Sequence, residues 1–230
     1  MNKKVLVVLM VLVLAVAGLS AKGSVKAGAQ LGWGFDIASM NVTEKNKEGS
    51  MGAKNNGFAF ALTGEYAFDK NWSVKANFGM MFAGKATAGY NARGLNVEVY
   101  SEEASGLYID AAIDAKYTYA INKQISVAGF AGFELVSGQL LKDFDSVVDQ
   151  LGIGYDDSNF ANVGFGVNLG VEGAYQLTNE VAITGGVNFA WLFVNSFSST
   201  EFAKSMQEEA DKFSVNSFYI RPYHGATYAF

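Results

Sequence analysis

The chain has 230 residues and a formal net charge of −5 at pH 7, with 14% aromatic and 17% charged residues. This acidic balance leaves no basic stripe to displace counterions, which argues against a nucleic-acid partner. The absence of cysteine excludes a disulfide framework, a thiolate metal site, a cysteine nucleophile and an N-terminal lipid anchor.

The first residues have the pattern of a secretory signal peptide. Two lysines precede an unbroken apolar run over residues 5–19, and small residues follow it. The run is shorter than the ~20 residues that a membrane-spanning helix needs. We therefore expect residues 1–21 to be a signal peptide, cleaved after Ser20 or Ala21, and residues 22–230 to form one β-barrel domain.

Eight later segments alternate between large apolar residues and small or polar residues. A period of two is typical of β-strands with one apolar and one polar face. The eight segments cover residues 25–39, 58–68, 72–82, 107–119, 125–135, 163–175, 181–193 and 218–230. Three of the links between them repeat one pattern, an aromatic residue before a tight polar turn, at residues 66–72, 119–125 and 175–181.

Short and long connections alternate along the chain. The three short turns follow the second, fourth and sixth segments, whereas four long connections cover roughly residues 41–57, 85–105, 137–161 and 195–212. This layout predicts an up-and-down antiparallel sheet whose two ends face different compartments. Long loops without regular structure are rare inside compact soluble domains.

The apolar face of these segments carries too many large side chains to fill a barrel. An eight-stranded barrel is only just wide enough for its own interior side chains. The aromatic residues on this face include Tyr66, Phe68, Trp72, Phe78, Phe82, Tyr117, Tyr119, Phe133, Phe165, Tyr175, Phe189, Trp191, Tyr228 and Phe230. The opposite face consists of Gly, Ala, Ser, Asn and a few charged residues, which do fit. We therefore predict an all-β fold, an eight-stranded antiparallel up-and-down transmembrane β-barrel with its apolar face in lipid, four long outer loops and three short periplasmic turns.

Charges of both signs share the predicted lumen face. They are Asp36, Glu65, Asp110, Asp114, Glu134 and Glu172 together with Lys26, Lys75, Lys116 and Arg221. If Phe68 faces Trp72 across the first turn, Glu65 lies directly opposite Lys75. Buried charges are tolerated when they are paired and hydrogen-bonded. We expect an ion-pair core made of Glu65, Lys75, Asp110, Asp114, Lys116, Glu134, Glu172 and Arg221. The alternative is a narrow aqueous path through the lumen.

The last segment carries the most specific pattern. Phe230 is the last residue, and Phe218, Ile220, Ala226 and Tyr228 fall on the same face. This resembles the closing strand of bacterial outer-membrane β-barrels, and the predicted domain as a whole resembles the small eight-stranded group that includes the OmpA membrane domain, OmpX and OmpW. The resemblance implies a bacterial outer-membrane location, with the lipid bilayer, periplasmic chaperones and the barrel-assembly machinery as partners. It also implies that Tyr228 and Phe230 form an assembly signal.

Candidates for catalysis or cofactor binding are few. The only histidine, His224, falls on the apolar face, whereas a Ser-His-Asp device needs its base beside the nucleophile in a pocket. Gly164, Gly166 and Gly170 are not a nucleotide loop because no helix follows them, and we expect them to face the lumen beneath bulkier neighbours. We therefore expect no enzyme activity, no catalytic residue, no cofactor and no metal site.

The third and fourth long connections contain helical patterns. An amphipathic helix is predicted by apolar residues that recur every three or four positions, Leu141, Phe144, Val147, Val148 and Leu151. In the fourth connection Ser198 and Glu201 form a capping box. Such helices could cap the lumen, lie on lipid headgroups or bind a partner.

These observations lead to two functional hypotheses. The first is a non-enzymatic integral outer-membrane protein whose surface loops mediate interaction, with an extracellular or host ligand, or support membrane integrity. The second is passive transport of small or hydrophobic molecules across the outer membrane. An ion-pair core predicts little or no single-channel current, whereas a transporter predicts steady openings.

Overall fold

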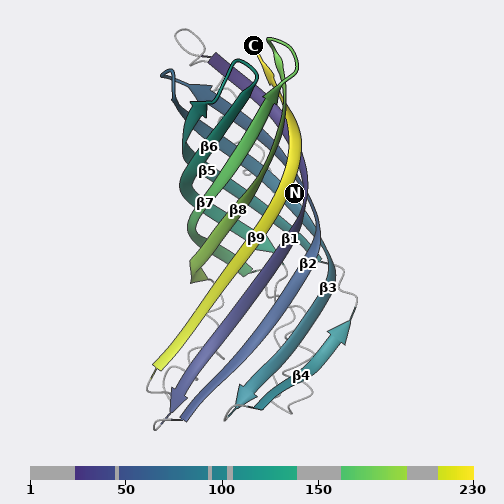
Figure 1. Ribbon diagram of the computed structural model, residues 1–230. Helices are drawn as coiled ribbons and strands as arrows, with labels where there is room; N and C mark the ends of the chain where they lie inside the picture. The colour runs from purple at the N-terminus through teal and green to yellow at the C-terminus, as the bar shows by residue number, and fades with distance from the viewer. Residues whose placement is uncertain (1–23, 45–46, 93–94, 103–105, 139–161, 196–211) are drawn as a thin grey trace, which may run out of the picture.

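The computed structural model describes the backbone of residues 24–44, 47–92, 95–102, 106–138, 162–195 and 212–230 (Figure 1). Side chains are described over residues 24–37, 54–82, 107–137, 164–193 and 216–230. The described chain forms β1 (Ser24–Glu44), β2 (Lys47–Ala67), β3 (Trp72–Ala92), β4 (Leu95–Glu102), β5 (Gly106–Ala120), β6 (Ile125–Gly138), β7 (Asn162–Gln176), β8 (Val181–Asn195) and β9 (Lys212–Ala229). Within these ranges no helix is long and apolar enough to cross a membrane.

The strands close into a barrel of eight. Every neighbouring pair is antiparallel, and the ring closes because β1 pairs with β9 while β2 pairs with both β1 and β3. The edge of β3 away from β2 pairs with β5 over Trp72–Ala83 and with β4 over Ala86–Ala92. Thus β4 and β5 are two parts of the fourth barrel strand. The predicted eight-stranded up-and-down barrel is confirmed.

Three tight turns close one end of the barrel, which we call the turn end. Backbone hydrogen bonds cross each turn, from Phe68 N to Trp72 O, from Ile121 N to Ile125 O and from Leu177 N to Val181 O. A polar side chain supports each turn by accepting a backbone N–H two residues further on, Asp69 in the first, Asn122 in the second and Thr178 in the third. The three short turns therefore lie where the sequence predicts them.

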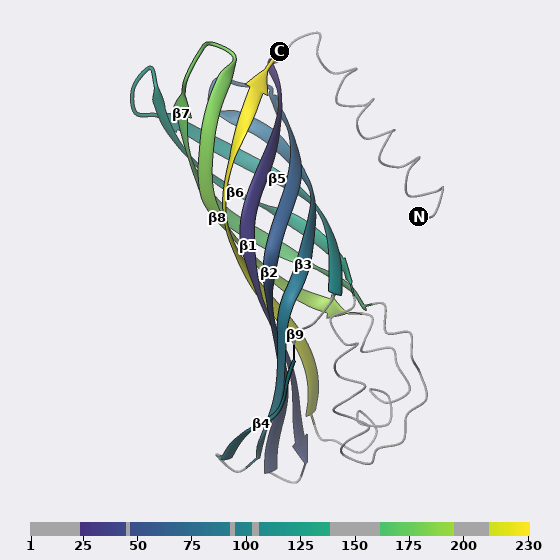
Figure 2. The ribbon, with the colours of Figure 1, turned by 90° about the vertical axis from the view of Figure 1, so that its right-hand side faces the viewer.

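At the other end four strands continue past the barrel. Figures 1 and 2 show β1, β2, β3 and β9 projecting beyond the ends of β5 to β8, with β4 beside the projecting part of β3. We call this part the extension; it comprises residues 38–44, 47–55, 85–92, 95–102 and 212–216. It corrects the expectation of irregular loops over 41–57 and 85–105, because β1 and β2 stay paired as far as Glu44 and Lys47. The sequence signal fails there because large apolar residues no longer occupy the positions that continue the outer face.

Several sequence predictions lie outside the described residues. These are the signal peptide over 1–21, the amphipathic pattern over 141–151 and the capping box at Ser198 and Glu201.

The outer wall of the barrel is apolar, as the sequence predicts. Phe133 and Tyr119 are each 60% exposed, and Trp33 and Phe82 are 44% and 50% exposed. Aromatic rings contact one another near both rims, for example Trp72 with Tyr117 and Phe133 with Phe165. An apolar belt bordered by aromatic residues is stable around a closed barrel when lipid surrounds it.

Glycines on the inner wall make room for large interior side chains. A Cβ atom at Gly170 would collide with the ring of Phe130, and one at Gly186 would lie 2.7 Å from the hydroxyl of Tyr223. Gly164 lies under Leu192 in the same way. These pairings explain how a narrow barrel accommodates a few aromatic side chains inside.

Candidate functional site: the charged lumen

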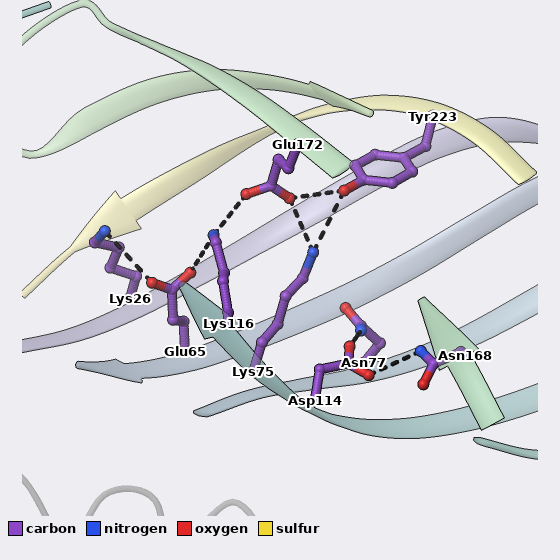
Figure 3. Close-up of polar contacts among 9 residues, drawn as sticks. All are labelled: Lys26, Glu65, Lys75, Asn77, Asp114, Lys116, Asn168, Glu172 and Tyr223. Atoms are coloured by element: carbon purple, nitrogen blue, oxygen red, sulfur yellow. Dashed lines mark hydrogen bonds and ion pairs between the residues drawn. The ribbon is translucent and has the colours of Figure 1, made fainter. Parts of the chain in front are cut away.

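The half of the lumen near the turn end holds a chain of alternating charges (Figure 3). Lys26, Glu65, Lys116, Glu172 and Lys75 follow one another in this chain, and they come from β1, β2, β5, β7 and β3. Strand alternation turns each of these positions inward, and barrel closure brings the five strands around one axis.

Glu172 is the centre of this chain. Its Oε1 accepts a hydrogen bond from Lys116 Nζ at 2.6 Å, and its Oε2 accepts one from Lys75 Nζ and one from the Tyr223 hydroxyl, each at 2.8 Å. The ammonium of Lys75 also lies 4.6 Å from the ring centre of Phe130, a cation–π distance. Glu172 and Lys75 are 5% and 3% exposed, so both charges are buried and well partnered.

Glu65 extends the chain toward the turn end. Its Oε2 lies 2.7 Å from Lys116 Nζ and its Oε1 lies 3.6 Å from Lys26 Nζ. The register places Glu65 opposite Lys75, as the sequence predicts, yet Lys75 bonds across the lumen to Glu172. Direct opposition on adjacent strands therefore does not decide the ion-pair partner.

A second polar layer surrounds Arg221, nearer the extension. The guanidinium of Arg221 makes two parallel hydrogen bonds to Asp110, 3.0 Å from NH1 to Oδ1 and 2.8 Å from NH2 to Oδ2. This bidentate geometry is the strongest form of such a pair. Nearby, Glu134 accepts a 3.4 Å hydrogen bond from Asn188, and Asp36 accepts one from Ser217 at 2.9 Å.

Asp114 lies between the two layers and has amide partners. Asn77 Nδ2 donates to its Oδ2 at 2.9 Å, and Asn168 Nδ2 donates to its Oδ1 at 2.8 Å. Among the described side chains no cation lies within 4.0 Å of Asp114 or Glu134. These two carboxyl groups are thus held by amides instead of ion pairs.

Beyond Arg221 the lumen holds apolar and polar side chains together. The larger buried side chains there are Met81, Tyr108, Val136, Leu192 and Tyr219, and the polar residues Asp36, Asn55 and Ser217 are buried at the same level. Tyr108 also accepts a 2.7 Å hydrogen bond from Asn55 Nδ2. This mixed layer lies between the Arg221 layer and the extension.

Two small hollows remain inside. One, of about 60 Å³, lies at the turn end and is lined by Lys26, Glu65, Lys116, Glu172 and Glu180 among others. The second, of about 20 Å³, lies between Lys75 and Arg221. On this measure, which counts the space open to the centre of a water molecule, about 10–15 Å³ is enough for one water, so the two hollows hold a few water molecules at most. In the part of the chain that the structure describes, no group of three His, Asp or Glu side chains could hold a metal ion.

The structure places all eight predicted core residues in the lumen. It brings together Glu65, Lys75, Lys116 and Glu172 in one network and Asp110 with Arg221 in another. Asp114 and Glu134 instead accept hydrogen bonds from amide side chains. The alternation in the sequence places Asn77, Asn168 and Asn188 on the lumen face. It does not show that their amides are the partners of Asp114 and Glu134.

The two proposed assembly residues lie at the turn end on the outer wall. The rings of Tyr228 and Phe230 are in edge contact, with centres 5.1 Å apart, and both are exposed. The backbone N–H of Phe230 donates to Val25 O at 2.9 Å, which ties the last residue to the first strand. His224 is exposed on the same outer wall, away from the lumen charges.

A closed barrel with a polar interior and a continuous apolar outer wall defines a transmembrane β-barrel protein. The family model for the outer membrane protein β-barrel domain matches residues 6–230. The chain belongs to this family, and its location is the bacterial outer membrane.

The chain is similar to several solved structures. The outer membrane protein OprG from Pseudomonas aeruginosa is 10% identical, with a TM-score of 0.50 over 90% of this chain and 97% of that chain. The Neisserial surface protein A is also 10% identical, with a TM-score of 0.45 over 89% of this chain and 97% of that chain. No protein among the curated sequences matches the chain.

Proposed function

We propose that this protein is a non-enzymatic membrane anchor that does not conduct and that presents the extension at the cell surface for interaction or for support of the envelope. The observation that carries this proposal is the filled lumen. Two ionic layers and one layer of mixed apolar and polar side chains occupy it, and the remaining hollows have room only for water. A solute path would require all three layers to rearrange.

The extension supports the surface role. The extension is a five-stranded sheet in the order β9, β1, β2, β3 and β4. Among the described strands, β4 pairs only with β3, and the first residues of β9 pair only with β1. Unpaired strand edges offer backbone groups to a partner in an extended conformation. An extracellular or host protein that pairs with such an edge is the partner class we favour.

Single-channel recording in a planar bilayer tests the non-conducting part. We expect no steady openings from the purified full-length barrel. Steady openings would favour passive transport of small solutes instead. Glu172→Ala removes the centre of the charged chain and serves as the control. It shows whether the recording detects a lumen whose ion pairs are disrupted.

The lipid-facing position of His224 supports the absence of enzyme activity. The described lumen contains carboxyl groups and amines but no histidine, so it offers no imidazole base to a hydroxyl nucleophile. We propose no cofactor for the same interior. Hydrolysis of peptide or lipid substrates by the purified barrel, lost in a lumen variant, would overturn this part.

We further propose that the turn end faces the periplasm and that residues 1–21 are removed during export. Strand count supports this orientation, because eight strands return the chain to the side on which it began. An epitope inserted near Lys54 should be labelled on intact cells, and one near Asn122 should not. Labelling at Asn122 would invert the orientation.

Tyr228 and Phe230 are the proposed signal for the assembly machinery. Deleting Phe230 removes an aromatic side chain that is 79% exposed, so the folded barrel loses at most the roughly 1.5–3 kcal/mol that burying such a side chain in lipid supplies. The outer-membrane level should nevertheless collapse. Arg221→Ala should be exported and destabilised instead, because Asp110 loses its partner. Unchanged outer-membrane levels after Phe230 deletion would contradict the signal.

A further inference from the structure

The lipid-facing wall of the barrel carries one ionisable side chain, His224, halfway along β9. The residues that alternate outward along this strand are Phe218, Ile220, Pro222, His224, Ala226, Tyr228 and Phe230. The register partner of His224 on β1, Leu31, is likewise the middle residue of the outward row from Val25 to Ile37. Aromatic residues stand at both ends of the β9 row, so His224 is about as far from one rim as from the other.

This position is deep in the hydrocarbon layer. From His224 to Phe218, or to Phe230, the strand covers ~20 Å at ~3.3 Å per residue. At a strand tilt of ~40° this is ~15 Å along the membrane normal, which is about half of the ~25–30 Å thickness of the apolar layer. Ionisable side chains at such a depth are rare, and they usually mark a functional contact because lipid tails cannot solvate them.

The barrel itself offers the imidazole of His224 no partner. Its outward neighbours are Pro222 and Ala226 along β9, with Leu31 and Gly185 on the adjacent strands. None of these four has a polar side chain, and among the described residues no group forms a hydrogen bond with the imidazole. A neutral imidazole has one nitrogen that donates and one that accepts. Leaving both unsatisfied in hydrocarbon costs free energy.

The wall beside His224 is low. Gly185 is paired across the β7–β8 ladder with Gly173, and both are exposed on the outer wall. A Cβ atom would meet nothing nearer than 3.7 Å at Gly185 or 3.8 Å at Gly173. Figure 1 shows β7, β8 and β9 side by side on this part of the wall. Small residues in a membrane surface let a second backbone approach closely, so there is room for another protein next to the imidazole.

We propose that this patch, formed by His224, Gly185, Gly173, Ala226 and Leu31, is the contact surface of a homodimer in the outer membrane. A lipid tail in the patch would leave the imidazole unsatisfied. A second copy inserts in the same direction, so its own histidine lies at the same depth. Across a two-fold axis along the membrane normal, the N–H of one imidazole would donate to the unprotonated nitrogen of the other.

The contact does not depend on the anchor role proposed above. It uses only the outer wall, so the lumen and the extension stay as they are in a single barrel. An axis along the membrane normal would carry the extensions of both copies on the same side of the membrane. The dimer would thus present two sets of free strand edges to a surface partner.

Energy transfer between dye-labelled barrels in lipid vesicles tests the proposal. The dyes are attached to Asn179→Cys, in the exposed β7–β8 turn of a chain without native cysteine. Donor-labelled and acceptor-labelled copies of the purified barrel are mixed over a range of protein-to-lipid ratios. We expect more transfer than randomly placed monomers give. Transfer at the random level would overturn the dimer and would leave a lipid or a different membrane protein as the occupant of the patch.

His224→Leu should raise the dimer dissociation constant about tenfold, because it removes the hydrogen bond and adds no charge. Ile113→Leu is the control, since Ile113 is 53% exposed on β5, across the barrel from β9. It should leave the constant unchanged. An unchanged constant in His224→Leu, or an equal rise in Ile113→Leu, would overturn the assignment of the contact to His224.

A second variant tests the low wall while His224 stays in place. Gly185→Leu fills the patch, and it should also raise the dissociation constant about tenfold or more because the two backbones can no longer approach. Gly64→Leu is the matched control on β2, where a new Cβ atom meets nothing within 4 Å. The heat-dependent shift in gel mobility shows that each variant is folded. Dimers that persist in Gly185→Leu would mean that the copies meet through another surface, which would contradict the proposal.

Discussion

The barrel wall and the extension share the strands β1, β2, β3 and β9, but their sequences alternate in opposite ways. β1 carries Trp33 and Phe35 outward in the barrel, and its sequence has Ser39 and Asn41 at the positions that continue this face, while its pairing to β2 goes on without a break. Lipid outside and charges inside select the first arrangement, whereas water outside selects the second. We therefore expect this strand to leave the hydrocarbon layer between Ile37 and Ser39.

The interior of the barrel holds buried charges that need partners. Its polar atoms cannot reach water freely, so they must satisfy one another. The Lys75–Glu172–Lys116–Glu65 chain does so with alternating charges, and Arg221 with Asp110 does so by bidentate pairing.

The largest expected effect is the loss of Glu172. Glu172→Ala leaves Lys75 and Lys116 without their shared partner in a buried layer, which should cost about 3–5 kcal/mol of unfolding free energy. Denaturant unfolding of the barrel in lipid vesicles measures it. Glu180→Ala, an exposed carboxylate in the β7–β8 turn, is the control and should change stability by less than about 0.5 kcal/mol. A similar loss in both variants would mean that the buried charges do not stabilise the half of the barrel near the turn end.

A charge placed on the outer face should reduce stability much more in the barrel than in the extension. Val171 is 60% exposed toward lipid, so Val171→Arg should lose about 2–4 kcal/mol, the range for arginine at depth in a bilayer. Asn41→Arg lies on the same side of the sheet but beyond Ser39, and should change stability by less than about 1 kcal/mol. Vesicle refolding followed by unfolding compares them. Equal costs would show that the extension is also in lipid.

Much of this wall could be predicted from sequence, and the extension could not. Between residues 25 and 37 the contrast between large aromatic and small polar residues is strong, so a period of two is visible. In the extension the alternation changes phase at the rim, and Gly84 adds a bulge in β3 that shifts the register near Asn56 and Gly57. Small residues such as Ala53 and Ala88 further reduce the contrast. A strand there therefore resembles a loop.

The sequence predicts which residues face the lumen but not which of them pair with one another. Alternation alone assigns Lys75 and Glu172 to the inner face. Their contact, however, joins β3 to β7 across the lumen, and that of Arg221 with Asp110 joins β9 to β5. Such contacts depend on barrel width and strand stagger, which local sequence does not encode.

An intermediate effect is expected where a glycine makes room inside. Gly170→Ala places a methyl group against Phe130 and should cost about 1–3 kcal/mol through overpacking. Gly129→Ala, on the outer wall with nothing within 4 Å of the new Cβ, is the matched control and should be neutral or stabilise by about 0.4–1 kcal/mol. Thermal unfolding by gel mobility shift ranks the two. A neutral Gly170→Ala would argue against a tightly packed lumen.

The smallest effect should come from Lys26. Its side chain is 37% exposed and its ammonium lies 3.6 Å from Glu65, so Lys26→Ala should cost only about 0.2–1 kcal/mol. Added salt should reduce even that difference, because exposed pairs are screened. Unfolding at low and high salt measures both. A loss as large as that of Glu172→Ala would mean that water does not reach the turn end of the lumen.

A nitroxide scan of β1 tests most directly whether its outward positions pass from lipid to water along one continuous strand. Single cysteines from Val25 to Thr43, in a chain without native cysteine, are labelled in bilayer vesicles, and their collisions with oxygen and with a water-soluble nickel complex are compared. We expect preferential oxygen contact at Leu31, Trp33 and Phe35 and preferential nickel contact at Ser39, Asn41 and Thr43. Oxygen contact that persists at Asn41 and Thr43, or nickel contact at Leu31 and Trp33, would contradict it.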